Sequence, residues 1–281
     1  MKRYIIVLST VFMLCFFIFS ACNSYSGISN EESIKKNVMV EGENVGGLKK
    51  SEIMRKILIY CGRVDKSAQD AKLDSETWEV EINEHSGKKV NVKRTVELLL
   101  NANPGEKGRL IIEEVHPRVT AEMLENNIKL LGSFTTIILD QRDERTNNIR
   151  LASERLDYVK VGPGEEFSFN EVLGKRTPGK GYEKAPIIIK TEKGPKKTYG
   201  IGGGICQLSS TLYNAVEEAG LKITERHSHS KAVGYVHKGK DAMVLYGSAD
   251  FRFINPGNYP IMIRVFISGD KLTVRILENR N

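Results

Sequence analysis

GIGGGICQLSSTLYNAVEEAG, residues 200–220, passes from a glycine-rich loop into a helix. Its apolar residues recur at intervals of three and four, which is the spacing of one helix face. They are Ile205, Leu208, Leu212, Ala215, Val216 and Ala219. Glycine is favoured directly after a last helical turn, so Gly220 is a natural stop. The pattern predicts a helix that begins at the end of the glycine loop.

The sequence on both sides of this helix predicts mainly β-structure. Upstream, we expect a strand at 131–139, a helix at 147–156 and a strand at 187–190. Downstream, we expect strands at 222–226, 232–237, 242–246 and 251–254, and a hairpin of 261–267 with 272–277. This half is therefore predicted to be an α+β domain in which the helix is followed by an antiparallel sheet.

The first half predicts a second small α+β domain. Its patterns favour helices at 52–61 and 92–100 and strands at 78–82 and 109–115. Trp78 is expected in the core, since a single tryptophan is more often packed than exposed as a sugar platform. We place the two domains at residues 37–120 and 121–281.

The N-terminus has the features of an export signal. Lys2 and Arg3 precede a hydrophobic run, and the run ends in Phe19-Ser20-Ala21-Cys22, which resembles a bacterial lipobox. We therefore expect a lipoprotein signal peptide at 1–21, lipidation of Cys22 and a polar tether over 22–36. The alternative is an uncleaved anchor helix. Both predict a protein held at the extracytoplasmic face of the bacterial membrane.

Composition narrows the class of protein. With 281 residues, 40% hydrophobic and 27% charged, the chain is not collagenous, coiled-coil or wholly disordered. Lys and Arg total 42 against 35 Asp and Glu, an excess too diffuse to indicate a nucleic-acid partner. The four cysteines match no small-domain disulfide framework. No cofactor is expected.

Cys206 is the candidate nucleophile. It falls in the first turn of the predicted helix, where the positive helix end favours a thiolate. The preceding Gly202, Gly203 and Gly204 let backbone N–H groups approach a substrate and supply an oxyanion hole. Gln207 is a further candidate donor. The competing interpretation is structural, with a tight glycine turn and a small buried cysteine.

A thiol nucleophile needs a base and a group that orients the base. His227 and His229 follow the helix by one strand, so one of them can meet Cys206. Asp241 is the expected orienting carboxylate, with Asp250 in reserve. The order of cysteine, histidine and polar residue resembles transglutaminase-like and NlpC-type wall peptidases in arrangement.

Two other interpretations use the same residues. His227 and His229, with Cys206 and an aspartate, have the donor types of a Zn²⁺ site. Alternatively, the glycine loop is an anion-binding nest that holds a wall polymer without chemistry, with Arg226, Lys231 and Lys180 contributing charge. Cys61 is expected to be partly buried. A disulfide between Cys61 and Cys206 would exclude the enzyme.

Motifs spread over the second half resemble the VanW family, named after an accessory protein of vancomycin-resistance clusters. They are LGSFTT, GPGEEFSFNEVLGKRTPGKGY, GGGICQLSSTLYNAVEEAGL, ERHSHS, GYVHKGKDAMV and DFRFIN, in this order from about residue 130 to the C-terminus. In the first half, VEGENVGGLKKSEI and HPRVTAEML resemble the peptidoglycan-binding domain that often precedes a VanW domain. The resemblance implies an exported envelope protein whose partner is peptidoglycan or another wall polymer, and the thiol chemistry implies a wall amidase, peptidase or transpeptidase.

Overall fold

The computed structural model describes residues 31–192 and 194–281. The expected signal peptide and the lipidation site at Cys22 lie outside the described residues, as does most of the expected tether. Among the residues that are described, no helix is long and apolar enough to span a lipid bilayer.

The described chain divides into two compact units, one of which is discontinuous in sequence. The first contains the residues up to Asp65 together with Lys89–Glu113, and the second contains Lys66–Lys88 together with Glu114–Asn281. This division differs from the single boundary that we expected at residues 120–121. Residues 66–88 join the second unit because their strands β3 (Lys72–Leu73) and β4 (Val80–Ile82) pack against helix α3 (Ala121–Asn126).

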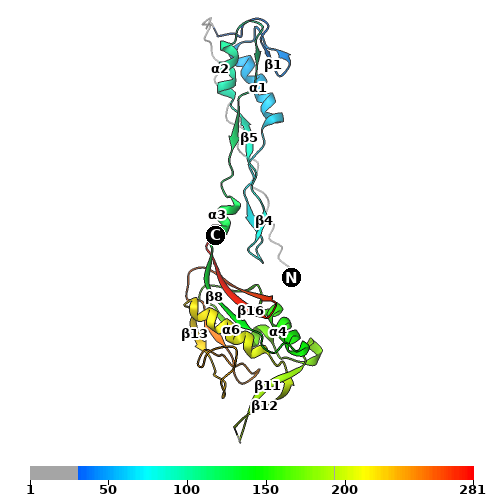
Figure 1. Ribbon diagram of the computed structural model, residues 1–281. Helices are drawn as coiled ribbons and strands as arrows, with labels where there is room; N and C mark the ends of the chain where they lie inside the picture. Colours follow the sequence, from blue (N-terminus) through cyan, green and yellow to red (C-terminus); the bar gives the residue numbers. More distant parts are fainter. Residues whose placement is uncertain (1–30, 193) are drawn as a thin grey trace, which may run out of the picture. The chain divides into compact units, whose positions relative to one another are not determined.

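The first unit packs two helices against a small sheet (Figure 1). The helices are α1 (Lys50–Val64) and α2 (Val92–Asn101), and the sheet has the order β2 (Glu43–Asn44), β1 (Met39–Val40) and β6 (Lys107–Gly108). A separate ribbon pairs β5 (Gly87–Val90) with β7 (Ile112–Val115). Apolar side chains from both helices, including Ile53, Ile57 and Leu99, form a core of their own.

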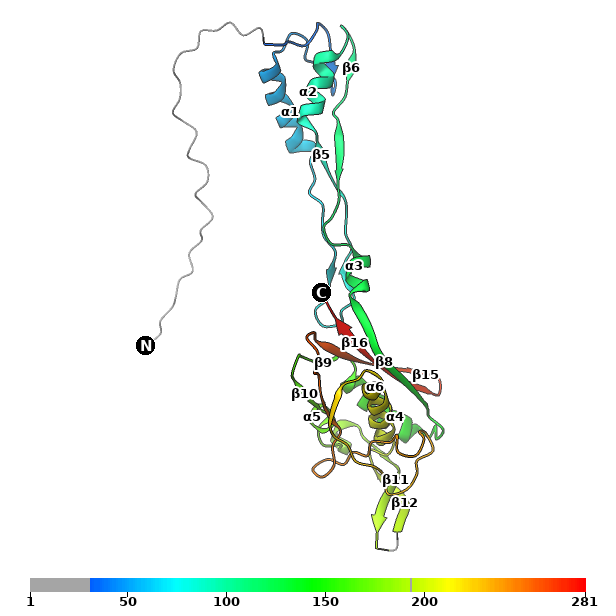
Figure 2. The same cartoon turned by 90° about the vertical axis from the view of Figure 1, so that its left-hand side faces the viewer.

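A four-stranded antiparallel sheet is the framework of the second unit. Its order is β8 (Ile128–Ile137), β16 (Lys271–Asn279), β15 (Ile261–Ser268) and β9 (Val159–Val161). Two helices pack on it and on each other, α6 (Ile205–Glu218) over β8 and β16, and α4 (Asp143–Leu156) over β15 (Figure 2). The helix predicted from the glycine-rich stretch is therefore the central helix of this unit.

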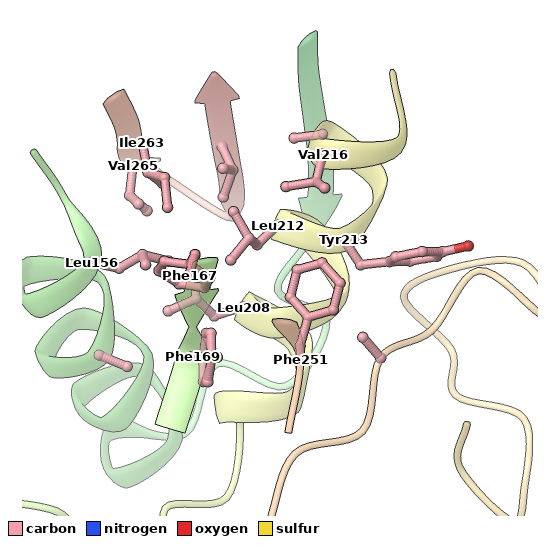
Figure 3. Close-up of a cluster of buried hydrophobic side chains, with 14 of the residues drawn as sticks. Leu156, Phe167, Phe169, Leu208, Leu212, Tyr213, Val216, Phe251, Ile263 and Val265 are labelled. Carbon is pink, nitrogen blue, oxygen red and sulfur yellow. The ribbon is translucent and has the colours of Figure 1, made fainter. Parts of the chain in front are cut away.

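The core of the second unit lies between these helices, the four-stranded sheet and a second sheet that is described below (Figure 3). Leu208 and Leu212 of α6 are fully buried there, together with Phe251 and Leu156. Close approach of α6 to the sheet depends on Gly132 in β8, where a Cβ atom would lie 2.3 Å from the carbonyl oxygen of Ala215. The LGSFTT strand therefore has a glycine where the helix crosses it.

A second sheet and a hairpin flank the start of α6. The sheet has the order β10 (Glu166–Ser168), β14 (Arg252–Ile254) and β13 (Lys222–Glu225), followed in the chain after β10 by α5 (Phe169–Leu173) and a short 3₁₀ turn, η1 (Pro178–Lys180). The hairpin pairs β11 (Lys184–Thr191) with β12 (Gly194–Ile201) and delivers the chain to the glycine loop. The α+β class is confirmed.

Two expected strands, 232–237 and 242–246, are not strands. The chain from Arg226 to Ala249 is a series of turns with isolated bridges at Met243 and Leu245. Side chains of α6 bind its carbonyl groups in place of a neighbouring strand: Ser209 donates to Ala242 at 2.6 Å and Asn214 donates to Lys240 at 2.7 Å. We name residues 226–249 the site loop.

Trp78 is buried, as expected, with 9% of its surface exposed.

Candidate functional site

The glycine loop sets the position of the first turn of α6. Gly202 and Gly204 have φ values of 80° and 110°, a region that favours glycine, and Gly204 is the N-cap of the helix. A Cβ atom at Gly203 would lie 2.7 Å from the backbone of Ala185 and Pro186 in β11. All three glycines are therefore required by the backbone path that leads to Cys206.

Cys206, His229 and Asp241 form a continuous chain of contacts at this first turn. The Nδ1 atom of His229 donates to Oδ2 of Asp241 at 2.6 Å, and the backbone N–H of His229 donates to the same oxygen at 2.6 Å. The Cys206 thiol lies close enough to this ring to raise the pKa of His229, and it donates a hydrogen bond to the carbonyl oxygen of Val244 at 3.5 Å. Because the side chains of His229 and Asp241 are only 8% and 10% exposed, the pair is held rigidly beside the half-buried cysteine.

The ionisation of the pair follows from these contacts. Burial alone would lower the pKa of His229, but the hydrogen bonds and charges of Cys206 and Asp241 outweigh it, and the pKa is raised. Burial likewise opposes the ionised form of Asp241, yet the hydrogen bonds from His229 lower its pKa. Both directions favour an imidazolium next to an ionised carboxylate.

These two shifts predict a pH dependence of stability. The contribution of His229 is complete below its unfolded pKa of about 6.5 and is lost as pH rises through its higher folded pKa. That of Asp241 is complete above about 3.9 and is lost as pH falls through its lower folded pKa. The free-energy difference between wild type and Asp241→Asn should therefore be greatest between about pH 4 and 6.5, at about 1–3 kcal/mol. Urea unfolding across pH 3–9 measures it, and a difference that does not vary with pH would contradict the assignment.

The other histidine and the reserve aspartate lie elsewhere. Nε2 of His227 is 2.8 Å from Oε1 of Glu225, and its side chain is 42% exposed. Asp250 accepts hydrogen bonds from Ser168 at 2.5 Å and from the backbone of Asn170 at 2.9 Å. Asp250 thus caps the start of α5, while Asp241 orients the histidine.

Gln207 and Arg226 have positions that differ from our expectation. The amide nitrogen of Gln207 donates to Ile137 at 2.9 Å and to Thr136 at 3.1 Å, so it is not free to bind a substrate oxyanion. Arg226 donates to the carbonyl oxygen of Asp241 at 2.7 Å, and its guanidinium lies 4.6 Å from the centre of the Tyr213 ring. Arg226 also forms an ion pair with the Asp241 carboxylate at 3.5 Å, so it anchors the segment that carries Asp241.

Three residues near Cys206 were missed by the sequence patterns: Arg145 of α4, Arg176 after α5, and Tyr235 of the site loop. Burial lowers the pKa of Arg176, and the charge of Cys206 opposes this shift. Burial also raises the pKa of Tyr235, and the charge of the nearby Cys206 acts in the same direction. The three residues come from different parts of the chain, so no local sequence motif identifies them as a group.

The two remaining expectations concern a metal site and a disulfide bond. Within the described residues, no group of three or more His, Cys, Asp or Glu side chains is arranged to hold a metal ion. Cys61 and Cys206 are both free thiols. The disulfide that would have removed the nucleophile is therefore not formed.

A surface groove of about 610 Å³ lies between β8, α6 and the site loop, and Cys206, His229 and Asp241 are not among the residues that line it. Phe134 and Thr135 of β8 and Glu217 of α6 form part of its wall, and Tyr235 and Lys240 of the site loop form another part. Tyr235 borders the groove and also lies near Cys206.

The comparison with family models locates this site within a known domain type. The model described as "VanW like protein" matches residues 144–277, which include Cys206, His229 and Asp241. Residues 144–277 are similar to this family, and we call them the VanW-like domain below. The VanW-like domain thus contains the whole Cys206 centre, and the first unit lies outside the match.

Two curated relatives are similar to part of this chain. The uncharacterized protein YoaR of Bacillus subtilis (strain 168) is 44% identical over 163 residues, which are 58% of this chain and 52% of that protein. The vancomycin B-type resistance protein VanW of Enterococcus faecalis (strain ATCC 700802 / V583) is 23% identical over 163 residues, 56% of this chain and 58% of that protein. The chain thus spans little more than half the length of either relative. No solved structure matches the chain.

Proposed function

We propose that the VanW-like domain is a thiol enzyme of the cell envelope that makes or breaks amide bonds in peptidoglycan peptides. The observation that supports this proposal is the hydrogen-bonded pair of His229 and Asp241 beside Cys206 at the start of α6. Acyl transfer of this kind requires a nucleophile, a base and a group that orients the base. The sequence motifs support two further parts of the proposal. These are the cell wall as the substrate and a lipid anchor at Cys22 on the outer face of the membrane.

In the first step, the Cys206 thiolate attacks the carbonyl carbon of a peptide amide. The carbonyl electron pair moves to oxygen, and the helix start is suited to stabilise this oxyanion through backbone N–H groups. The C–N bond then breaks, and His229 gives its proton to the leaving amine. The products are a thioester on Cys206 and a free amine.

In the second step, water or another amine attacks the thioester. His229 removes a proton from the attacking group, the C–S bond breaks, and Cys206 leaves as thiolate. Attack by water gives a peptidase or amidase, and attack by an amine gives a transpeptidase. Asp241 holds the His229 ring in the orientation that both steps need.

The second candidate is a wall-binding module without chemistry. It is favoured by the groove beside Tyr235 and by the position of the glycine loop, whose backbone N–H groups can bind an anion. In this case Cys206 is a packing residue, and the polymer binds without a covalent step.

Incubation of the protein with purified peptidoglycan peptides separates the candidates. We expect mass spectrometry to detect a cleaved or newly joined amide bond, together with a transient thioester adduct on Cys206. Sedimentation with insoluble wall material measures binding in the same samples. Binding without any change in the peptides would contradict the enzyme and leave the binding module.

A further inference from the structure

Two arginines lie against the glycine loop, on either side of the path to Cys206. A Cβ atom built on Gly202 would be 3.5 Å from Cγ of Arg176, and one built on Gly204 would be 3.1 Å from Cγ of Arg145. The bare backbone of the loop therefore leaves room for two arginine stems. Arg176 lies close enough to Cys206 for the two charges to interact, and Arg145 reaches Gln207, the residue that follows Cys206 in α6.

Neither arginine forms an ion pair within 4 Å in the part of the chain that the structure describes, although the charge of Asp250 also acts on Arg176. Arg176 donates to neutral oxygens, Asn170 Oδ1 at 2.6 Å and Gly174 O at 3.2 Å. Arg145 donates to Oε1 of Gln207 at 2.9 Å, and its Nε is buried without a hydrogen-bond partner. Other arginines of this unit, such as Arg252 and Arg264, contact carboxylates.

A guanidinium held away from water without an anion is destabilising, and so is a buried donor without an acceptor. Burial lowers the pKa of Arg176, which reflects this cost. Retaining two such groups beside a nucleophile is explained if a ligand supplies the missing negative charge. Arginine is well suited to this, because its planar fork matches the two oxygens of a carboxylate.

We propose that Arg145 and Arg176 form a carboxylate-binding subsite, so that the acyl donor of this enzyme is a peptide with a free carboxylate close to the scissile amide. The claim that the bound peptide is an acyl donor rests on the proposed function. The carboxylate-binding subsite itself can be tested without turnover. The carboxylate is either the C-terminal one or that of an acidic side chain.

The first test compares two alkylating reagents that differ in charge. Iodoacetate carries a carboxylate and iodoacetamide does not, and peptide mapping reports the labelling of Cys206 alone. We expect the ratio of the iodoacetate rate to the iodoacetamide rate to exceed that of N-acetylcysteinamide by about tenfold. The excess should shrink in 1 M NaCl, where charges are screened within about 3 Å.

Variants of the full-length chain then locate the effect. Arg145→Met and Arg176→Met should each reduce the excess severalfold, and Arg176→Lys, which keeps the charge, should retain most of it. Arg150→Met is the matched control, because Arg150 is exposed on the same helix as Arg145 and pairs with Glu154. Circular dichroism identifies any variant that does not fold, and the salt test on wild type stands without variants. A ratio equal to that of the small thiol, or no labelling by either reagent, would overturn the subsite.

Protection experiments identify the source of the carboxylate. N-acetyl-Ala-Ala, its C-terminal amide, and N-acetylglutamate α-amide are added during alkylation by iodoacetamide. Protection by the first alone assigns a C-terminal carboxylate, and protection by the third assigns a side-chain carboxylate. Protection by none of them, or by the C-terminal amide equally, would contradict the subsite. A selective carboxylate effect with no turnover of any peptide would instead refute the enzyme and retain the subsite.

Discussion

Replacing Cys206 with serine is expected to lower the turnover of peptidoglycan peptides by about a thousandfold or more. Serine fits the same space at the helix start, so the fold and the binding of wall material should be retained. The hydroxyl is not ionised near neutral pH, and His229 would have to remove its proton during the attack. Product formation followed by mass spectrometry measures the loss.

Cys61→Ser is the control for this variant. Cys61 is a half-buried thiol of α1 in the other unit, where burial raises its pKa. Its replacement should leave turnover unchanged. Equal activity of Cys206→Ser and wild type would show that the thiol is not the nucleophile, and the binding module would then be the better account.

Leu208→Ala is expected to destabilise the second unit by about 2–5 kcal/mol. Leu208 is fully buried in the core between α6, α4 and the sheets (Figure 3). Because it follows Cys206 by two residues on α6, a cavity here loosens the helix turn that carries the thiol. Denaturant unfolding monitored by fluorescence gives the change in free energy.

The matched control is Leu139→Ala, which removes the same atoms from a side chain that is 72% exposed. A change within about 0.5 kcal/mol is expected there. Similar losses at both positions would mean that α6 is not packed as the structure has it.

The sequence was most informative where a local pattern and the tertiary fold agree. The helix after the glycine loop, the terminal hairpin and the stop at Gly220 each follow from residues close together in the chain, and Gly220 has the expected positive φ of 69°. Cys206, Asp241 and the two histidines His227 and His229 are candidates by residue type, and the sequence does not choose between the histidines. The sequence does not show which of these side chains lie together. The structure places Cys206, His229 and Asp241 beside one another.

The remaining features depend on contacts that no local pattern records. Residues 232–246 alternate like strands, but Ser209 and Asn214 of α6 take up the carbonyl groups that a neighbouring strand would have bound. Arg145 and Arg176 reach the site from separate elements, and only the packing of the glycine loop brings them together. Gln207 has the right type for an oxyanion donor, yet its amide is already bonded to β8.

The most direct test of the Cys206 centre is the rate at which iodoacetamide labels Cys206 in wild type, His229→Ala and His227→Ala. The thiolate is the reactive form of a cysteine. Of the two histidines, His229 lies beside Cys206, whereas His227 is hydrogen-bonded to Glu225. At neutral pH, His229→Ala should slow the labelling by at least about tenfold, and His227→Ala should leave it unchanged. Equal rates in all three proteins would contradict the account.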